Sequence, residues 1–314
     1  MKKIALIGEC MIELNGKPFG NMWQSYGGDT LNTATYLSRI SKKEDVSIHY
    51  VSALGTDKLS YEMLTHWQND GINTDCVLLD SKHQPGLYLI QLDEKGERTF
   101  LYWRNDSAAR YLLSNPNFSD IVNQLKKMDM IYLSGISLAI LPKNDRTLLI
   151  KILENLHQKG IEIVFDSNFR PKLWENLQEA QEYYRQLLPL VDLALVTLDD
   201  EKALWNDANE EETLHRLKQI GIPKVILKCG QNGAIFYDKD QRKTAQVATQ
   251  IINNVIDTTS AGDSFNAGFL QGYLTGKSLE ICCQQGNKLA GIVIQHKGAI
   301  IDKTATSYLK SEFN

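Results

Sequence analysis

The stretch "DTTSAGDSFNAGFL", Asp257–Leu270, sets one aspartate directly behind three residues with small side chains or none. These residues leave backbone N–H groups uncovered just before Asp263, and Ser264–Thr275 is predicted to form a helix that ends at Gly276. Uncovered amides at a helix N-terminus bind anions well, phosphate above all. Asp263 is therefore either the cap of this helix or a base that lies beside a bound anion.

The composition is that of an ordinary globular protein. The chain has 314 residues, of which 43% are hydrophobic and 23% charged. A chain of this length commonly folds as one α/β domain, and we expect a single domain over residues 1–314. The net charge is −4, and the Lys and Arg residues are scattered, which argues against a nucleic-acid surface.

The sequence shows no apolar run long enough to span a membrane, so no membrane partner is expected. The N-terminal "MKKIALIGECMIEL" has a short apolar core that Glu9 and Glu13 interrupt, and it is interpreted as a first buried strand rather than a signal peptide. The five cysteines have no metal-binding spacing, and an odd number suits a reducing compartment. A cytoplasmic location is predicted.

Short apolar runs alternate with helical patterns through most of the chain. This alternation predicts βαβ units and a doubly wound, mostly parallel sheet with helices on both faces. In such folds, ligands bind beyond the carboxyl ends of the strands. The predicted strands are Ile4–Ile7, Ile48–Ala53, Met130–Leu133, Ile161–Phe165, Leu193–Thr197 and Val225–Lys228, and the further predicted helices are Thr30–Ile40, Tyr61–Asn69, Arg146–His157, Glu179–Leu188 and Glu211–Gln219.

One segment, Pro85–Asn105, departs from this alternation. It predicts two strands joined by a polar turn at Asp93–Glu97, hence a β-hairpin at about residues 86–105. The hairpin is either a lid over the strand ends or an oligomer contact, and its aromatic side chains disfavour a merely solvated excursion. Period-two alternation puts Phe100, Tyr102 and Arg104 on one face of the second strand and Leu101 and Trp103 on the other.

The motif Asp257–Leu270 matches throughout the C-terminal signature of the ribokinase-like sugar kinases, the phosphofructokinase-B family. "GGDTLNTA" at Gly27–Ala34 resembles the N-terminal signature of that family, and "LGTD" and "DGIN" follow at familiar spacing. The resemblance extends from Lys3 to about Ile301. It implies a ribokinase-like α/β fold with a small β lid, and a kinase that uses ATP and Mg²⁺.

The resemblance also gives the opening motif a chemical role. Phosphoryl transfer needs preorganised donors for the negative charge that develops on the moving group. The backbone amides of Ser260, Ala261, Gly262 and Asp263 would supply them, and Asp263 would accept the proton of the attacking hydroxyl. Because these amides and the helix dipole favour an anion, the pKa of Asp263 is expected to be lowered.

The nucleotide side is predicted from "LKCGQNGAIF" at Leu227–Phe236, where the family loop lies against ATP. The sequence has no Walker A motif and no dinucleotide fingerprint, which makes a P-loop enzyme or a nicotinamide dehydrogenase improbable. Asn287 matches an adenine-pocket position, although a solvent-facing helical Asn is the alternative. The residues expected to bind ATP are Asn168, Lys228, Gly230, Gly233, Ser260, Gly262 and Asn287.

The magnesium site departs from the family pattern. Many members carry Asn-x-x-Glu after a middle strand, whereas this chain has "TLDDE" at Thr197–Glu201 and lacks the amide. Asp200 and Glu201 are the candidates to hold hydrated Mg²⁺ through water.

The N-terminal motif is expected to hold the sugar. Gly27 and Gly28 let the backbone approach a substrate, and Asp29 and Asn32 supply hydrogen-bonding groups. Asp29 is equally well explained as the N-cap of the following helix. Glu13 falls where family members often bind a sugar hydroxyl, and a plain surface Glu is the competing interpretation.

Two arginines narrow the class of substrate. Arg104 lies on the predicted lid, and Arg170 follows a strand in "FDSNFRPKLW". A guanidinium recognises a planar carboxylate better than a hydroxyl, so the pair favours a sugar acid. Either could be an ordinary surface arginine, and Arg170 could instead bind the phosphates of ATP.

Within the family, "GECMIEL", "YWRN" and "NFRPKLW" resemble the 2-keto-3-deoxygluconate kinases. This resemblance implies that Tyr88, Tyr102, Arg104 and Arg170 surround the keto acid, and that Asn168 lies between sugar and nucleotide. The alternatives are a kinase of a neutral sugar such as fructose or ribose, a nucleoside kinase, or a catalytically dead sugar-acid sensor. The intact 260–263 segment argues against the sensor, because a sensor needs no base.

Overall fold

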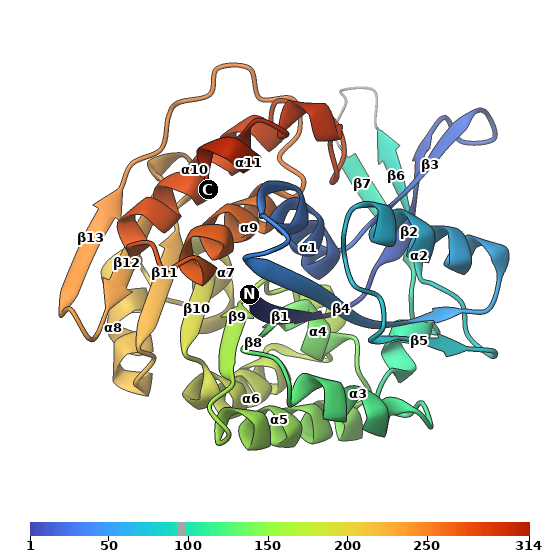
Figure 1. The fold of residues 1–314 in the computed structure, drawn as a ribbon, viewed down its shortest axis with the longest axis horizontal. Helices are drawn as coiled ribbons and strands as arrows, with labels where there is room; N and C mark the ends of the chain where they lie inside the picture. Colours follow the sequence, from blue (N-terminus) through green and yellow to red (C-terminus); the bar gives the residue numbers. More distant parts are fainter. Residues whose placement is uncertain (93–97) are drawn as a thin grey trace.

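The computed structural model describes residues 1–92 and 98–314, and its core is one nine-stranded sheet with the strand order β13-β12-β11-β10-β9-β8-β1-β4-β5 (Figure 1). The strands from β11 to β5 are mutually parallel, and β12 and β13 add an antiparallel edge. The bounds are β1 Lys2–Ile7, β4 Val46–Gly55, β5 Val77–Asp80, β8 Met130–Ser134, β9 Glu162–Asp166, β10 Leu193–Thr197, β11 Lys224–Lys228, β12 Ala234–Asp238 and β13 Lys243–Val247. The predicted doubly wound, mostly parallel sheet is confirmed.

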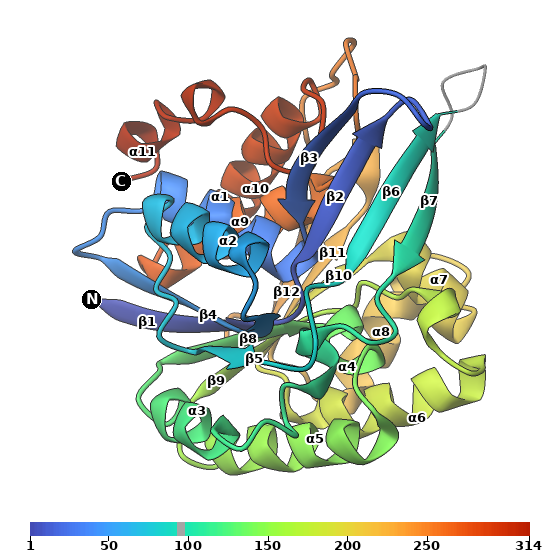
Figure 2. The same cartoon turned by 90° about the vertical axis from the view of Figure 1, so that its right-hand side faces the viewer.

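Helices cover both faces of this sheet, and each face has its own hydrophobic core (Figure 2). One layer contains α1 Asp29–Ile40, α2 Lys58–Asn69, α9 Ala261–Leu274, α10 Leu279–Val293 and α11 Leu309–Glu312. The other contains α3 Phe118–Leu125, α4 Gly135–Ala139, α5 Lys143–His157, α6 Leu177–Leu187, α7 Leu198–Trp205 and α8 Glu210–Ile220. None of the helices in the described part of the chain combines the length and apolar character needed to cross a bilayer.

A second sheet with the order β3-β2-β6-β7 stands beside the strand ends (Figure 2). Its strands are β2 Met11–Gly16, β3 Met22–Gly27, β6 Leu87–Leu92 and β7 Arg98–Trp103. The predicted hairpin is therefore present as β6 and β7, while its expected turn at Asp93–Glu97 lies outside the described residues. The sequence analysis missed the hairpin of β2 and β3, which completes this sheet.

The N-terminal segment contains the predicted strand Ile4–Ile7, as part of β1, and a second strand that was not predicted. It divides at residues 8–10 into β1 and β2, which belong to different sheets. The alternation of the second hairpin strand is confirmed, because the Tyr102 ring lies 6.0 Å from that of Tyr88 and 6.3 Å from that of Phe100. Trp103, on the other face, is 59% exposed.

Helix α9 begins at Ala261, three residues earlier than predicted. Ser260 has a left-handed φ of 64°, which turns the chain sharply into the helix. Asp263 consequently lies within the first helical turn rather than ahead of it. Gly276 has a φ of 79° just past Thr275, as expected for a residue that ends a helix.

Candidate active site

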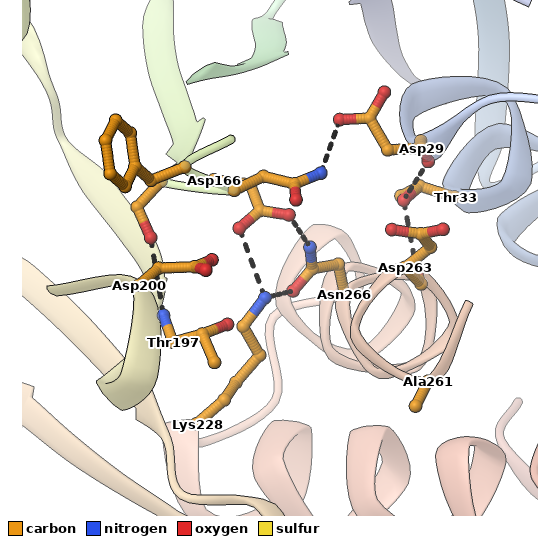
Figure 3. Close-up of polar contacts among 12 residues, drawn as sticks. Asp29, Thr33, Asp166, Thr197, Asp200, Lys228, Ala261, Asp263 and Asn266 are labelled. Atoms are coloured by element: carbon orange, nitrogen blue, oxygen red, sulfur yellow. Dashed lines mark hydrogen bonds and ion pairs between the residues drawn. The ribbon is translucent and has the colours of Figure 1, made fainter. Parts of the chain in front are cut away.

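The N-termini of α1 and α9 meet at the carboxyl ends of the central strands, where the opening motif was expected to act (Figures 1 and 3). The first amides of a helix have no intrahelical acceptor. The amide of Ala261 donates to the carbonyl of Thr258 at 3.2 Å, whereas those of Gly262 and Asp263 have no backbone acceptor among the described residues. Ser260 Oγ is buried and lacks a partner in the same part of the chain. This turn therefore presents unused donors and fits an anion.

The carboxylate of Asp263 does not cap its own helix. Its Oδ2 accepts a hydrogen bond of 2.8 Å from Asn32 Nδ2 of α1, and α9 has no side-chain cap. Thr33 Oγ1 donates to the Asp263 carbonyl at 3.2 Å and thus ties the two helices together. This geometry favours the interpretation of Asp263 as a base over its interpretation as a cap.

The pKa expected for Asp263 was wrong in direction. Burial raises the pKa of Asp263 to about 7, together with the nearby carboxylates of Asp29 and Asp166. The hydrogen bond from Asn32 and the positive charge of Lys228 act in the opposite direction without reversing the shift. Sequence reasoning counted the amides of α9 but not the two carboxylates that the fold brings alongside.

Asp29 is the first residue of α1, and Gly28 occupies the N-cap position. The Asp29 carboxylate accepts a 2.6 Å hydrogen bond from Asn168 Nδ2. Burial raises the pKa of Asp29, and the Asp166 carboxylate adds to the shift. The N-cap interpretation of Asp29 is therefore wrong, and its carboxylate faces the site instead.

A buried hydrogen-bond network lies behind the turn at residues 260–263, which we call the anion-binding turn after its proposed role (Figure 3). The sequence analysis did not predict this network. Lys228 Nζ, at the end of β11, contacts Asp166 Oδ1 at 3.2 Å and Asn266 Oδ1 at 3.1 Å. Asn266 of α9 donates to Asp166 Oδ2 at 2.8 Å and to the Tyr132 hydroxyl at 2.9 Å. The position of Asp166 directly after the predicted strand Ile161–Phe165 was the one signal that could have identified it.

The ammonium of Lys228 lies under the anion-binding turn. A Cβ added to Gly262 would be 3.6 Å from Lys228 Nζ. Lys228 is only 7% exposed, so its charge is poorly screened by water. The structure thus places a fixed positive charge beside the unused amides, on the side where the nucleotide was expected.

Of the other predicted nucleotide residues, Asn287 lines a separate cavity, whereas Gly230 and Gly233 lie in a turn that is not part of its lining. Gly230 and Gly233 form the turn between β11 and β12, where a Cβ on Gly233 would lie 2.2 Å from the Val247 carbonyl oxygen. Asn287 of α10 donates to the carbonyls of Val247 and Ala248 at 3.3 Å each, so it is not simply solvent-facing. It lines a cavity of about 420 Å³, between residues 248–252 and α10, that is large enough for a purine ring.

The two magnesium candidates differ in their surroundings. Glu201 is buried and accepts a 2.6 Å hydrogen bond from Arg216, which occupies its carboxylate. Asp200 lies 3.4 Å from Arg170 and also faces the backbone of Phe169, and burial raises its pKa to about 6. In residues 1–92 and 98–314, no three acidic, His or Cys side chains form a metal-binding group. A metal here would therefore depend mainly on the phosphates of a nucleotide, as Mg²⁺ commonly does.

On the sugar side, Glu13 lies inside β2 and is buried, so it is not a surface residue. Its carboxylate accepts hydrogen bonds from the Tyr88 hydroxyl and from Ser25 Oγ, the latter at 3.1 Å. A Cβ on Gly27 would lie 2.7 Å from the Tyr88 hydroxyl, and one on Gly28 would lie 2.1 Å from the carbonyl oxygen of Glu9. The two glycines thus let the backbone pack closely against Tyr88 and Glu9.

The two arginines pair with different carboxylates. Arg104 forms a buried ion pair with Glu9, and its Nε has no partner among the described residues. Arg170 is half exposed, donates to the Phe169 carbonyl at 2.9 Å and lies 3.4 Å from Asp200. Tyr102 is 51% exposed, with the Arg104 guanidinium 5.9 Å from its ring centre. Arg104 thus lies at the end of β7 in the second sheet, and Arg170 lies beside Asp200.

Comparisons with known proteins identify the family of this chain. The family described as "pfkB family carbohydrate kinase" matches residues 1–306. The chain is 69% identical over 314 residues, all of both chains, to a 2-dehydro-3-deoxygluconokinase of Haemophilus influenzae. It is 44% identical to one of Dickeya dadantii over 96% of this chain and 97% of that one.

Solved structures show the same fold at low sequence identity. A PfkB protein from Polaromonas sp. JS666 superposes with a TM-score of 0.81, covers 98% of this chain and 99% of its own, and is 22% identical. The family match covers nearly the whole chain. The chain therefore belongs to the pfkB family of carbohydrate kinases.

Proposed function

We propose that the protein transfers the γ-phosphoryl group of ATP to the terminal hydroxyl of 2-keto-3-deoxygluconate, which is the same compound as 2-dehydro-3-deoxygluconate. The product is 2-keto-3-deoxy-6-phosphogluconate. The observation that carries the proposal is the 69% identity, over the full length of both chains, to a kinase named for this sugar acid. The contacts of Asp263 and of the two arginines support it.

Asp263 acts as the general base in this proposal. It takes the proton of the attacking hydroxyl while that oxygen bonds to phosphorus and the bond to the leaving ADP breaks. A base with a pKa of about 7 is ionised in a large fraction of molecules at neutral pH and is strong enough to help. Asn32 orients its carboxylate through the 2.8 Å hydrogen bond.

The anion-binding turn stabilises the moving phosphoryl group. The unused amides of Gly262 and Asp263, with the dipole of α9, meet the negative charge on its oxygens. The amide of Ala261 joins them once it leaves the Thr258 carbonyl, and Ser260 Oγ supplies a hydroxyl. Lys228 adds a positive charge next to Gly262.

Magnesium fits the carboxylate of Asp200 better than that of Glu201, because Arg216 already occupies Glu201. Asp200 would hold the ion through water, and the bound ion would neutralise charge on the phosphates of ATP. The adenine would lie in the cavity beside Asn287.

The acid end of the substrate is recognised on the lid side. Arg104 Nε has no partner in residues 1–92 and 98–314, and Tyr88 and Tyr102 line the same face of the second sheet. Arg170 serves either the carboxylate of the acid or the phosphates of ATP, because it stands beside Asp200. These assignments make a neutral sugar the weaker candidate.

The test is ADP release with Mg²⁺-ATP and five acceptors in parallel: 2-keto-3-deoxygluconate, 2-keto-3-deoxygalactonate, fructose, ribose and adenosine. We expect strong preference for the first acid. Turnover on a neutral sugar alone would keep the kinase and remove the roles of Arg104 and Arg170. Binding of the acid without ADP release would instead identify a sensor.

Self-association through the hairpin at residues 86–105 stays a prediction, as does a cytoplasmic location. The outward side chains Leu101 and Trp103 are 38% and 59% exposed, and β7 is an unpaired edge of its sheet. Analytical ultracentrifugation of the wild type and of Trp103→Lys measures the self-association. A smaller assembly for the variant supports contact through this hairpin.

A further inference from the structure

Asn168 has a backbone conformation that few side-chain-bearing residues adopt. Its φ is 28°, and it follows directly after Ser167 in the loop beyond β9 rather than ending a helix. Asn206 also has a positive φ of 63°, but it caps the C-terminus of α7, where this conformation is common. A conformation of this kind away from a helix end persists only when its surroundings enforce it, and it points to function.

The surroundings of Asn168 do enforce it. The carbonyl of the preceding Ser167 accepts a 2.5 Å hydrogen bond from the Tyr184 hydroxyl, and Ser167 Oγ accepts one of 3.4 Å from the amide of Thr197. Gly135 leaves room for this contact, because a Cβ there would lie 1.8 Å from the Tyr184 hydroxyl and 2.2 Å from the Ser167 carbonyl oxygen. Groups from α6, β10 and α4 therefore fix the loop from three sides.

The enforced conformation directs the carboxamide of Asn168 at Asp29. Asn168 is 6% exposed, and its Nδ2 lies 2.6 Å from Asp29 Oδ2. An ionised carboxylate only accepts hydrogen bonds, so the NH₂ group of Asn168 must face it. Asp29 gains a short donor that does not depend on water, within a site that also contains Asp263.

We propose that Asn168 is a positioning residue, whose enforced backbone conformation holds Asp29 ionised and oriented as a hydrogen-bond acceptor for the sugar beside the base Asp263. The proposal rests on the proposed function, since it assigns Asp29 to the bound acceptor. It adds a role on the sugar side for a residue that the sequence associated with ATP. Both carboxylates must then be ionised in the active enzyme.

The groups around Asp29 determine the expected pH effect. The carboxylates of Asp166 from β9 and Asp263 from α9 disfavour the ionised form of Asp29. Hydrogen bonds from Asn168, Ser134 and the amide of Thr30 favour it. Lys228 from β11 favours the ionised form of Asp263. Loss of the Asn168 donor makes the doubly ionised state harder to reach. The acidic limb of the pH profile of kcat/KM should therefore move to higher pH.

The experiment compares Asn168→Ala, which loses the donor, with Asn168→Asp, which also adds a charge. We expect the acidic limb to move up by about 0.5–1 pH unit in the first variant and about 1–2 in the second. At pH 7, kcat/KM should fall ~10- to 100-fold. Asn206→Ala, at the other Asn with positive φ, should leave the pH profile unchanged. An unmoved acidic limb in both Asn168 variants overturns the proposal.

An exchange of the two side chains separates positioning from simple support. Asp29→Asn combined with Asn168→Asp rebuilds a carboxamide–carboxylate hydrogen bond but puts the charge on the wrong residue. We expect the double variant to recover melting temperature relative to Asn168→Asp while it stays inactive. Recovery of activity would show that only the hydrogen bond matters, and would overturn the role of an ionised Asp29.

A titration without acceptor distinguishes this proposal from the proposed function. Carboxyl carbon NMR of the unliganded protein follows Asp29 and Asp263 directly. Their coupled titration should move to higher pH in Asn168→Ala whether or not the wild type accepts 2-keto-3-deoxygluconate. A shift without turnover on that acid refutes the substrate but supports the coupling, whereas unchanged titration refutes the coupling alone.

The backbone strain has its own measurement. Asn168→Gly and Asn168→Ala both lose the donor, but only glycine adopts positive φ freely. The glycine variant should melt about 2 °C higher than the alanine variant and be equally impaired in activity. Equal melting temperatures would contradict an enforced conformation at this position.

Discussion

Asn32 and Asp263 are 231 positions apart in the chain, and Nδ2 of the first donates a 2.8 Å hydrogen bond to Oδ2 of the second. This contact joins the two signature segments of the family at one carboxylate. It turns the Asp263 side chain away from the amides of its own helix, which stay available for an anion. The proposed base and the amides proposed to bind the anion thus come from the same short segment without competing for each other.

Asp263→Asn should lower kcat roughly 10²- to 10⁴-fold and leave the binding of both substrates nearly unchanged, because the amide cannot take the proton. Steady-state kinetics with 2-keto-3-deoxygluconate and ATP measures the change. Asp120, also the third residue of its helix, is exposed on α3, and Asp120→Asn is the matched control. Turnover near that of the wild type in Asp263→Asn would reduce Asp263 to a structural residue.

The raised pKa of Asp263 also predicts a pH-dependent stability. The folded protein holds this proton more tightly than the unfolded chain, so the contribution of Asp263 to stability declines as pH rises from its ordinary value of 3.8 to about 7. Asp263→Asn removes that penalty, and its melting temperature should exceed that of the wild type at pH 8 but not at pH 4. A difference that does not vary with pH would contradict the raised pKa.

The ionisation of Asp263 should also govern activity, which we expect to rise with pH while the contribution of Asp263 to stability declines. The base works only when ionised, so kcat/KM should decline as pH falls through about 7. A profile of kcat/KM between pH 5 and 9, measured at saturating Mg²⁺-ATP, locates this limb. An acidic limb near pH 4 would show that Asp263 keeps the ordinary pKa of an aspartate.

Arg104→Ala should raise KM for the sugar acid at least ~10-fold and leave KM for ATP unchanged. It should also cost about 3–5 kcal/mol of stability, because Glu9 is left as a buried unpaired charge. The double variant with Glu9→Gln should regain much of the stability but not the affinity. Equal weakening of acid and ATP would move Arg104 out of the acceptor pocket.

Lys228→Met should lower kcat ~10²-fold with every acceptor, because the positive charge beside Gly262 is lost. Its partner Asp166 would remain buried and unpaired, so the double variant with Asp166→Asn is measured as well. The second substitution should restore melting temperature but not turnover. Full activity in the stable double variant would show that Lys228 acts only in folding.

Gly291→Val should raise KM for ATP ~10-fold or more without a change in KM for the acid. Gly291 lines the cavity beside Asn287, and the added side chain would extend toward Ile252, 3.5 Å from a Cβ there. Isothermal titration with an ATP analogue measures the loss directly. Unchanged nucleotide affinity would place the adenine elsewhere.

Much of the fold and the position of the proposed base, Asp263, at the start of a helix could be predicted from the sequence. The apolar runs of the central strands are nearly continuous because these strands are covered on both faces, so short uninterrupted apolar runs identify them. The small residues before Asp263 indicated an anion-binding helix start, since this is a property of a few consecutive residues. The β2–β3 hairpin was missed because "MIELNG" and "MWQSYG" lack a strong strand pattern. These two strands pair with each other, and β2 also pairs with β6 of the second sheet.

Only the tertiary structure decided the electrostatics of the site. Asp29, Asp166 and Asp263 come from three distant segments, and burial together with the nearby carboxylates raises the pKa of Asp29 and of Asp263, whereas local reasoning expected the pKa of Asp263 to be lowered. The fold also brings Lys228 next to Asp166 and directs the carboxamide of Asn168 toward Asp29, and neither contact is visible in the local sequence. The sequence by itself determined the family, the parallel sheet and the small-residue turn at the start of α9, because these depend on local pattern. Charge coupling depends on distances across the fold, which no local pattern contains.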